Sequence, residues 1–421
     1  MTPVDNPLSL SPTRRRTRRR HADREAEGAA DAPTVDEVLS RVTRMKPLLR
    51  EHSAQGEEDR RLPEESVRAL SGAGALQLTM PRRYGGCEAG VRSLLDVYSA
   101  LAEADGAAAW VTMVLNSGAF SVALFPEEVQ DEVFAVEEPA RISPVVAATG
   151  HGHRESGGWR VSGRWHYASG SWHATWAAVG IPVTDESGEL IDQAMVLLPR
   201  TDFTVEDTWR VSGLRASGSN CIVADDVFVP ERRVGSALAR LAGDNVHDHP
   251  GGPLYRSSVA SLLTLVVVGP LLGLAREALR LVTQKAHGKP VSYTFLANQA
   301  ESTAFQAELA RAATKIDTAH LHAYRSADDI DRAAAAGVPL DPAVRARVRA
   351  DVGLVAESVL EAVDLLVTAH GAGAFADAGA LQRIWRDVHI AARHGALQPG
   401  IGYEVLGKTL LGVPQNLSVF V

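Results

Sequence analysis

Cysteine and aromatic residues are scarce in this sequence of 421 residues. The two cysteines, Cys87 and Cys221, lie far apart and form no Cys-x-x-Cys pair, which excludes a disulfide framework and a cysteine-based metal site. Phe, Trp and Tyr together make up only 5% of the chain, whereas alanine is abundant, and this balance favours helix. Free thiols suit a reducing compartment, so we expect a cytoplasmic protein.

Motifs that signal nucleotide, metal or acyl-transfer chemistry are also missing from the sequence. No glycine-rich phosphate loop follows a predicted strand, which argues against Rossmann and P-loop sites. There is no Gly-x-Ser-x-Gly nucleophile elbow and no His/Asp/Glu cluster at metal-ligand spacing, so no metal site is predicted. The net charge of -8 does not suggest a nucleic-acid partner.

Two segments could be mistaken for targeting or membrane signals. Residues 14–20 carry six arginines, but no apolar stretch follows them, so we expect residues 1–33 to form a disordered Arg-rich tail. The apolar stretch 259–275 is shorter than the roughly 20 residues that span a bilayer, and it contains Gly269 and Pro270. We therefore predict a buried bundle helix there and no contact with a membrane.

Hydrophobic periodicity predicts two different structures in the first half of the chain. Apolar residues recur at helical spacing over residues 34–141, and Thr34 with Glu37 forms a capping-box pattern at the first helix. Short β-prone segments, separated by Gly, Asp and Ser turns, follow over residues 142–235. We predict a helical N-terminal domain and then a β-domain.

The second half of the chain returns to long helical patterns. A connector is expected over residues 236–253, and residues 254–421 are then predicted to form an antiparallel four-helix bundle. The four expected helices span residues 257–288, 293–336, 341–370 and 378–395. The predicted fold class is thus α+β, mainly α, with a β-domain between two helical parts.

Several local strings occur in an order that can be compared with known families. They are 59–63 (DRRLP), 81–86 (PRRYGG), 105–110 (DGAAAW), 123–126 (ALFP), 163–171 (GRWHYASGS), 207–219 (DTWRVSGLRASGS) and 383–387 (RIWRD). Together with the domain order, they resemble the acyl-CoA dehydrogenase superfamily. The closest resemblance is to its flavin-dependent monooxygenase branch, the two-component oxygenases similar to 4-hydroxyphenylacetate, dibenzothiophene and steroid-catabolic monooxygenases.

One position separates the two branches of that superfamily. Many of its dehydrogenases abstract a proton with a glutamate that follows an Arg-Asp pair in the last bundle helix. Here the pair is Arg386-Asp387, and the corresponding position is Gly395, with His394 beside it. Glycine cannot accept a proton, so the resemblance implies a monooxygenase. A dehydrogenase whose base lies on another helix, and a flavin-free scaffold, remain as alternatives.

The resemblance implies a reaction and its partners. The expected enzyme is the oxygenase component of a two-component system that hydroxylates an aromatic or polyketide-like small molecule, a reaction typical of secondary metabolism. It would use O2 and FMNH2 or FADH2 through a C4a-hydroperoxyflavin. Because the sequence has no nicotinamide site, a separate NAD(P)H:flavin reductase is expected as partner. Members of the family are typically homotetramers.

The same resemblance implies the residues of the site. His394 and Ser169 are the expected catalytic residues, because an imidazole titrates near neutral pH and a hydroxyl can accept a hydrogen bond from the flavin N5–H. The expected flavin contacts are Ser169, Ser171, Trp209, Ser217, Ser219 and Arg256. Helical spacing places His389 and His394 on opposite sides of the last helix. His389 is expected to be a hydrogen-bonder at the bundle edge.

The expected substrate-binding residues are Asn116, Ser117, Phe120 and His394. Many aromatic hydroxylases of this branch carry a histidine just before the ALFP-like string, but residues 115–120 contain none. Asn116 and Ser117 can donate hydrogen bonds but cannot act as bases at neutral pH. This departure leaves a larger polyketide-like aromatic open as the substrate, as well as amine oxidation of the kind seen in sugar N-oxygenases.

Overall fold

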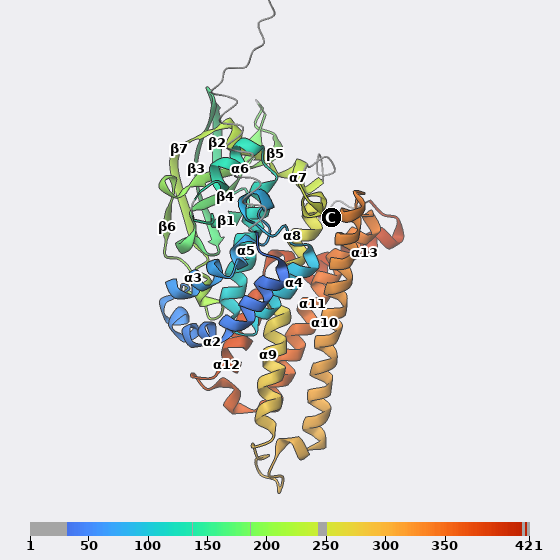
Figure 1. The fold of residues 1–421 in the computed structure, drawn as a ribbon. Helices are drawn as coiled ribbons and strands as arrows, with labels where there is room; N and C mark the ends of the chain where they lie inside the picture. Colours follow the sequence, from blue (N-terminus) through green and yellow to red (C-terminus); the bar gives the residue numbers. More distant parts are fainter. Residues whose placement is uncertain (1–31, 137, 186, 243–250, 415–416, 419–421) are drawn as a thin grey trace, which may run out of the picture.

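The structure is a computed structural model that describes residues 32–136, 138–185, 187–242, 251–414 and 417–418. Figure 1 shows strands at one end, short helices beside and beneath them, and long helices that extend away from the strands. The predicted fold class, α+β and mainly α, is confirmed. The predicted Arg-rich tail lies almost wholly outside the described residues, so the prediction of disorder there is untested.

The N-terminal part is helical, as predicted. Its first helix begins with the expected capping box: Thr34 accepts a hydrogen bond from the Glu37 backbone N–H, and the Glu37 carboxylate accepts one from the Thr34 N–H. The helices are α2 (Val35–Asp59), α3 (Glu64–Gly72), α4 (Val91–Ala102), α5 (Gly106–Ala123) and α6 (Glu127–Phe134). Helix α5 is buried along almost its whole length, so it forms the centre of the molecule.

The β-domain consists of two four-stranded sheets. One has the strand order β1-β4-β5-β8 and the other β2-β3-β7-β6. A separate apolar core fills the space between them, and Trp165 at its centre donates its indole N–H to the Gly180 carbonyl over 2.7 Å. The strands are β1 (Ile142–Val145), β2 (His151–Glu155), β3 (Gly158–Ala168), β4 (Trp176–Thr184), β5 (Leu190–Pro199), β6 (Thr204–Glu206), β7 (Asn220–Pro230) and β8 (Val234–Ser236).

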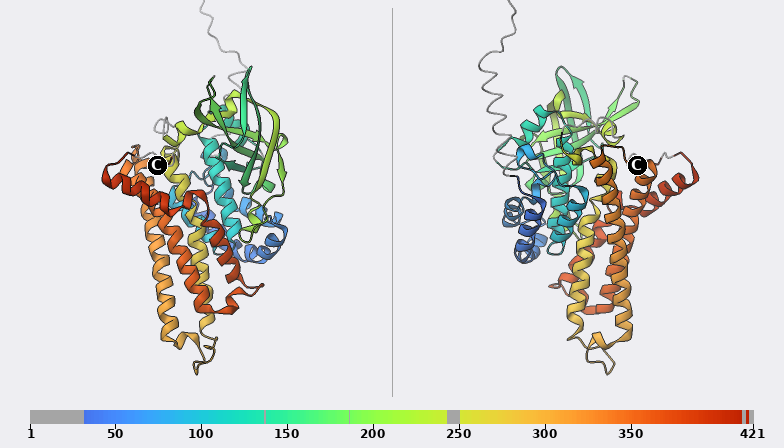
Figure 2. Two further views of the ribbon diagram at one scale, coloured as in Figure 1. Left: turned by 180° about the vertical axis from the view of Figure 1, so that it is seen from behind. Right: turned by 45° about the vertical axis from the view of Figure 1, so that its right-hand side comes forward.

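The C-terminal part is built around long helices that lie side by side in both views of Figure 2. A short helix, α7 (Ala237–Ala242), and a 3-10 turn, Pro253–Arg256, precede them. The helices of this part are α8 (Val259–Leu265), α9 (Val268–Ala286), α10 (Thr303–Ala336), α11 (Pro342–His370), α12 (Ala380–Ala391) and α13 (Pro399–Leu411). The sequence did not predict α13 as a separate helix.

Three predicted helix boundaries of the bundle were wrong. The helix expected over residues 257–288 is interrupted between α8 and α9, because Pro270 has no N–H to donate to the Val266 carbonyl. The helix expected from residue 293 begins only at Thr303, where the Ser302 side chain accepts a hydrogen bond from the Phe305 N–H. The helix expected over residues 378–395 is α12, which ends at Ala391, four residues before the predicted end.

In the part of the chain that the structure describes, two helical segments are long and apolar enough to cross a membrane. They are Gly106–Ala123 and Val259–Ala286, and 89% of the most apolar window of each is buried inside the fold. Burial of this extent is typical of core helices in globular proteins. The prediction of a buried bundle helix over residues 259–275 is therefore confirmed.

Candidate active site

Three serine hydroxyls from two turns of the β-domain form one buried cluster. Ser169 follows β3, while Ser217 and Ser219 precede β7. The Ser219 Oγ lies 2.7 Å from the Ser169 Oγ and 2.7 Å from the Ser217 Oγ. Two hydrogen bonds join three hydroxyls, so one hydroxyl proton remains for a group outside the cluster. The structure thus brings together three of the six predicted flavin-binding residues.

The indole of Trp110 joins this cluster to His394. Its N–H donates to the Ser169 Oγ over 3.1 Å. Its ring also makes an edge contact with the His394 imidazole, with 5.7 Å between ring centroids and 69° between the planes. Trp110 belongs to the string 105–110 that carries the family resemblance, but it was not predicted as a site residue. Its position between the two predicted catalytic residues depends on tertiary structure.

His394 lies in the turn after α12, not on the helix itself as the spacing predicted. Helix α12 ends at Ala391, and the His394 Nδ1 accepts a hydrogen bond from the Ala396 N–H over 3.2 Å. A neutral imidazole that accepts at Nδ1 carries its proton on Nε2. The ring is open to solvent at its edge, yet the surrounding protein lowers its pKa through desolvation. At neutral pH His394 therefore presents a neutral N–H donor.

The neighbouring Gly395 leaves the position of a dehydrogenase's glutamate empty. A Cβ atom built on Gly395 would meet nothing within 4 Å. The backbone there has no positive φ, so a side chain could be accommodated without strain. The space next to His394 is thus free of a carboxylate because of residue type rather than crowding.

His389 has the structural role that the sequence predicted for it. Its Nδ1 lies 2.8 Å from the Trp385 carbonyl one turn earlier in α12, and its Nε2 lies 3.5 Å from an Asp364 oxygen. The ring also lies against the Trp385 indole, with 4.3 Å between centroids. Both ring nitrogens therefore have partners on α11 and α12, away from the serine cluster.

A buried carboxylate, which sequence reasoning did not single out, ties the serine-bearing turn to α12. The Asp387 Oδ1 accepts a hydrogen bond of 2.6 Å from the Leu214 backbone N–H. The Asp387 side chain is 5% exposed. Burial, the largest cause, and the charge of Asp105 raise the pKa of Asp387 to about 7. The only signal in the sequence was its place in the Arg-Asp pair.

Two further predicted flavin contacts, Ser171 and Trp209, differ in how accessible they are to a ligand. The Ser171 hydroxyl is fully buried and donates to the Gly218 carbonyl over 3.0 Å, so it stabilises the turn that carries Ser217 and Ser219. Trp209 is half-buried, donates its indole N–H to the Leu214 carbonyl over 3.0 Å, and makes an edge contact with the exposed Tyr167. Trp209 therefore offers an accessible ring surface to a ligand, whereas the Ser171 hydroxyl is already bonded inside the fold.

Two of the predicted substrate contacts on α5 are buried in this structure, and their role in substrate binding stays a prediction. Asn116 is completely buried, and its amide nitrogen donates to the carbonyls of Ala75 and Thr112, both over 2.8 Å. Phe120 is also completely buried and stacks on Tyr255. Both are core residues, because the apolar pattern of α5 faces the protein on all sides.

Ser117 is half-buried, and its hydroxyl donates to the Met113 carbonyl in the preceding turn over 2.9 Å. A serine that is bonded in this way inside a helix has no free proton but keeps both lone pairs of its hydroxyl oxygen. Its role as a substrate contact remains a prediction, limited to accepting a hydrogen bond.

Arg256 ends the 3-10 turn Pro253–Arg256 and is half-buried. Its Nε is buried, and among the described residues it has no hydrogen-bond partner. The hydroxyl of the adjacent Ser257 is also buried without a partner. Because an unpaired buried donor is unfavourable, this pair fits a polar ligand that the apo chain does not supply.

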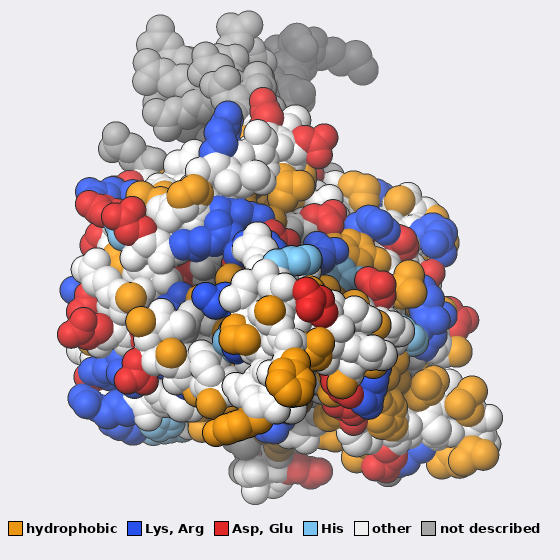
Figure 3. All heavy atoms as spheres, turned by 90° about the horizontal axis from the view of Figure 1, so that it is seen from below, with side chains coloured by type: hydrophobic (Ala, Val, Ile, Leu, Met, Phe, Trp, Pro, Cys, Tyr) orange, Lys and Arg blue, Asp and Glu red, His pale blue; other side chains and the backbone are white. Residues whose placement is uncertain are grey.

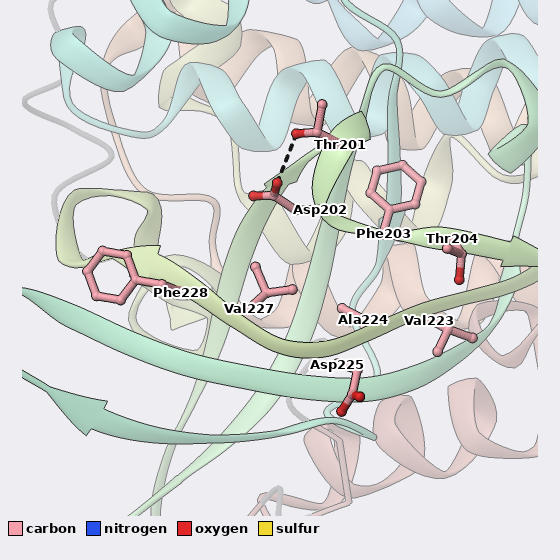
Figure 4. A pocket seen from close by; sticks show the side chains of 9 residues that line it. All are labelled: Thr201, Asp202, Phe203, Thr204, Val223, Ala224, Asp225, Val227 and Phe228. Carbon is pink, nitrogen blue, oxygen red and sulfur yellow. Dashed lines mark hydrogen bonds between the residues drawn. The ribbon is translucent and has the colours of Figure 1, made fainter.

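A separate recess lies on the outer face of the β-domain (Figure 4). It has a volume of about 520 Å³ and is lined by residues of β6, β7 and the turn before β6. The Thr201 hydroxyl donates to the Asp202 carboxylate at its rim over 2.8 Å. None of the predicted site residues lines it, so we do not assign it to the reaction.

Comparison with known proteins gives two family matches that flank the β-domain. Residues 42–135 match the acyl-CoA dehydrogenase N-terminal domain, and residues 265–399 match the acyl-CoA dehydrogenase C-terminal domain. Together these matches span more than half of the chain. The chain belongs to the acyl-CoA dehydrogenase superfamily. The family resemblance read from the sequence is thus confirmed.

Relatives place the chain in the monooxygenase branch. The flavin-dependent monooxygenase oxygenase subunit HsaA of Mycobacterium tuberculosis (strain H37Rv) is 31% identical over 90% of this chain and 96% of its own length. The FADH(2)-dependent resorcinol hydroxylase oxygenase component of a Rhizobium species is 28% identical over 89% of this chain and 94% of its own. The acyl-CoA dehydrogenase fold here belongs to a flavin-dependent monooxygenase.

A solved structure agrees with this placement. XiaF from a Streptomyces species, in complex with FADH2 and glycerol, superimposes with a TM-score of 0.87 and is 34% identical. The match covers 95% of this chain and 98% of XiaF. The three-part architecture is therefore shared along essentially the whole length of both proteins.

Proposed function

We propose that the chain is the oxygenase component of a two-component system that inserts one oxygen atom from O2 into an aromatic small molecule. The observation that carries this proposal is the arrangement of Ser169, Trp110 and His394. Trp110 contacts both the buried Ser169 hydroxyl, which can accept a hydrogen bond, and the neutral His394 imidazole, which can donate one. The glycine at position 395 supplies no carboxylate. This arrangement fits the activity named for the relatives and lacks the base that a dehydrogenase would carry at that position.

The donor and acceptor pattern of the described residues fits a reduced flavin. Ser169 has a lone pair for a ring N–H when its own proton points to Ser219. Trp209 offers a half-buried aromatic face, and Arg256 a buried N–H without a partner. We propose these residues as the flavin contacts, and FADH2 as the form used, because XiaF holds FADH2. The flavin supplies the electrons that activate O2.

The chain's own residues then control protons and water. Ser169 would accept the hydrogen bond from the flavin N5–H, and its burial with Ser217 and Ser219 would keep water away from that hydrogen bond. The exposed His394 uses Nδ1 to accept the Ala396 N–H, so its Nε2–H is the group that can donate to a substrate hydroxyl or an oxygen atom. In this tautomer His394 acts first as a hydrogen-bond donor. Service as a base would require loss of the Ala396 hydrogen bond.

A separate NAD(P)H:flavin reductase is proposed as the source of reduced flavin, since several relatives are named as oxygenase components or subunits. We also propose a homotetramer in the cytoplasm. Exposed apolar side chains support self-association: Leu410 and Leu411 on α13 are 78% and 79% exposed. Seen from below, hydrophobic side chains lie among charged ones on the face of the molecule that this view shows (Figure 3). Analytical ultracentrifugation would show a monomer if this inference fails.

The deciding experiment supplies chemically reduced FAD to the purified protein and adds oxygenated buffer with an aromatic test substrate such as resorcinol. We expect hydroxylated product to form with little hydrogen peroxide, and label from ¹⁸O2 to appear in the product. Anaerobic bleaching of oxidised flavin by an acyl-CoA, without a reductase, would instead identify a dehydrogenase. Absence of any reduced-flavin binding would identify a scaffold.

A further inference from the structure

Asp387 sits where three parts of the chain converge. It belongs to α12, its Oδ1 accepts the Leu214 N–H from the β-domain turn, and its Oδ2 lies 3.1 Å from the position of a Cβ on Gly106, the first residue of α5. Leu214 and Asp387 are 173 residues apart in sequence. One buried carboxylate thus contacts the last bundle helix, the β-domain and the central N-terminal helix.

The β-domain turn that contains Gly213 and Leu214 packs closely against α12. A Cβ on Gly213 would lie 2.2 Å from the Arg386 carbonyl oxygen, so only glycine allows this approach. Leu214 adopts φ +49°, a left-handed conformation that is unfavourable for a leucine and is held here by its N–H bond to Asp387. The Arg386 guanidinium also donates to the Ser212 carbonyl. Backbone geometry, and not only packing, therefore depends on Asp387.

Each contacted element leads directly to a residue of the site. Ser217 and Ser219 follow Leu214 by three and five residues, Trp110 follows Gly106 by four, and His394 follows Asp387 by seven. A shift at the junction would move the hydroxyl cluster relative to Trp110 and His394. Displacements on the order of 1 Å are enough to reduce catalysis strongly.

The charges around the carboxylate are unbalanced. Asp105, the N-cap of α5, faces Asp387 and repels its ionised form, while Arg383 on α12 attracts it. Glu57 on α2 adds a second negative charge nearby, although it is paired with Arg386. Among the described residues, Asp387 itself forms no ion pair. Its partner at hydrogen-bonding distance is the Leu214 backbone, which points to positioning of that turn.

We propose that Asp387 is a positioning residue that holds the turn 212–219, and with it the serine cluster, in register with Trp110 and His394. The proposal rests on the proposed function only for its catalytic consequence. The structural step, retention of the turn by the carboxylate, can be measured on the protein without flavin.

The first test is hydrogen exchange of the flavin-free protein with three variants. Asp387→Ala removes the acceptor, and we expect exchange in residues 212–219 to become about tenfold faster, the factor that corresponds to loss of one buried hydrogen bond. Asp387→Asn keeps a carbonyl acceptor and should stay within about twofold of the parent chain. Asp364→Ala is the matched control, because Asp364 accepts the Trp385 indole N–H on the exposed side of α12.

The second test measures how much reduced FAD is consumed to make peroxide instead of product. We expect Asp387→Ala to raise the peroxide fraction several-fold and Asp387→Asn to restore coupling, with Asp364→Ala unchanged. Equal exchange in the parent chain and Asp387→Ala would overturn the proposal. Faster exchange with normal coupling would leave Asp387 a purely structural residue and would also overturn it. If the parent chain itself shows no oxygenase activity, that result would count against the proposed function and not against the role of Asp387 in holding the turn.

If Asp387→Ala does not fold, the turn can be loosened from its other side. Arg386→Met removes the guanidinium bond to the Ser212 carbonyl but leaves Asp387 and the Gly213 approach in place. We expect slower exchange in residues 212–219 for Arg386→Met than for a double variant that adds Asp387→Leu, which removes the acceptor but fills the buried volume. Identical exchange in the single and double variants would show that Asp387 does not hold the turn.

Discussion

Trp110 and Ser169 are joined across two domains by a hydrogen bond of 3.1 Å between the indole N–H and the serine hydroxyl. The same indole ring lies edge-on against His394. One side chain of α5 therefore contacts both residues that the sequence predicted to be catalytic. This relationship leads to the first of four predictions.

Trp110→Phe should uncouple the reaction while keeping the fold. Phenylalanine retains an aromatic ring against His394 but removes the N–H that orients the Ser169 hydroxyl. Loss of one buried hydrogen bond of this kind corresponds to about a tenfold effect. We expect peroxide release per reduced flavin to rise by up to that factor. Trp385→Phe, which removes an indole bond to Asp364 on the far side of α12, serves as control and should behave normally.

His394→Ala should lower the single-turnover rate of hydroxylation about 100-fold, the lower end of the range for a group that donates or accepts a proton. His394→Gln, which keeps an N–H donor, should recover part of that loss. We expect this partial recovery because the Ala396 N–H bond to Nδ1 places the His394 proton on Nε2, so His394 acts as an N–H donor. A normal rate in His394→Ala would remove the residue from the mechanism, and His389→Ala should be unaffected because that ring bonds within the bundle.

The pH dependence of the hydroxylation rate should also show an acidic limb that is caused by protonation of His394. Desolvation lowers the pKa of this imidazole below its usual value of 6.5, so the neutral form predominates at neutral pH and is lost as the pH falls. Gly395→Glu places a carboxylate in open space beside the ring, and an opposite charge raises a histidine pKa. We expect the acidic limb of Gly395→Glu to move to higher pH, whereas Gly400→Glu, also in open space, should leave it in place.

Stability should fall with rising pH because of Asp387. Its pKa in the folded state is about 7, above the usual carboxyl value, so between these two values the folded chain binds the extra proton and the free energy of unfolding decreases as pH rises. From pH 6.5 to 8.5 this amounts to about 1 kcal/mol. Asp105 and Glu57 face the same carboxyl and repel its charged form, whereas Arg383 attracts it.

Urea unfolding, followed by tryptophan fluorescence at the two pH values, measures this difference. The parent chain should lose stability across the window, while Asp387→Asn should show a flatter dependence. Asp364→Asn, which alters a half-exposed carboxyl on the neighbouring helix, controls for a change in net charge. A parent chain and Asp387→Asn with parallel pH dependence would show that Asp387 is already ionised throughout the window.

Local chemistry determined much of the fold from the sequence alone. The Thr34 capping box, the change from helical to alternating patterning near residue 142 and the presence of long helices in the second half of the chain were all predicted, because each depends on neighbours within a few residues. Boundaries failed where one residue changed the backbone. Pro270 interrupts a helix that the apolar pattern continues, and the chain after Ala391 turns so that His394 can accept the Ala396 N–H.

The sequence also determined which chemistry the chain can perform, because residue type decides whether a carboxylate, an imidazole or a bare glycine stands at a position. Gly395 and His394 are such cases. Only the tertiary structure decided which side chains meet. Trp110, Leu214 and Asp387 are brought to the serine cluster from three domains, while Asn116 and Phe120 turn out to be core. The reason is physical: the chemistry that a side chain can perform depends on its residue type alone. A site, in contrast, depends on contacts between residues more than 50 positions apart in the sequence.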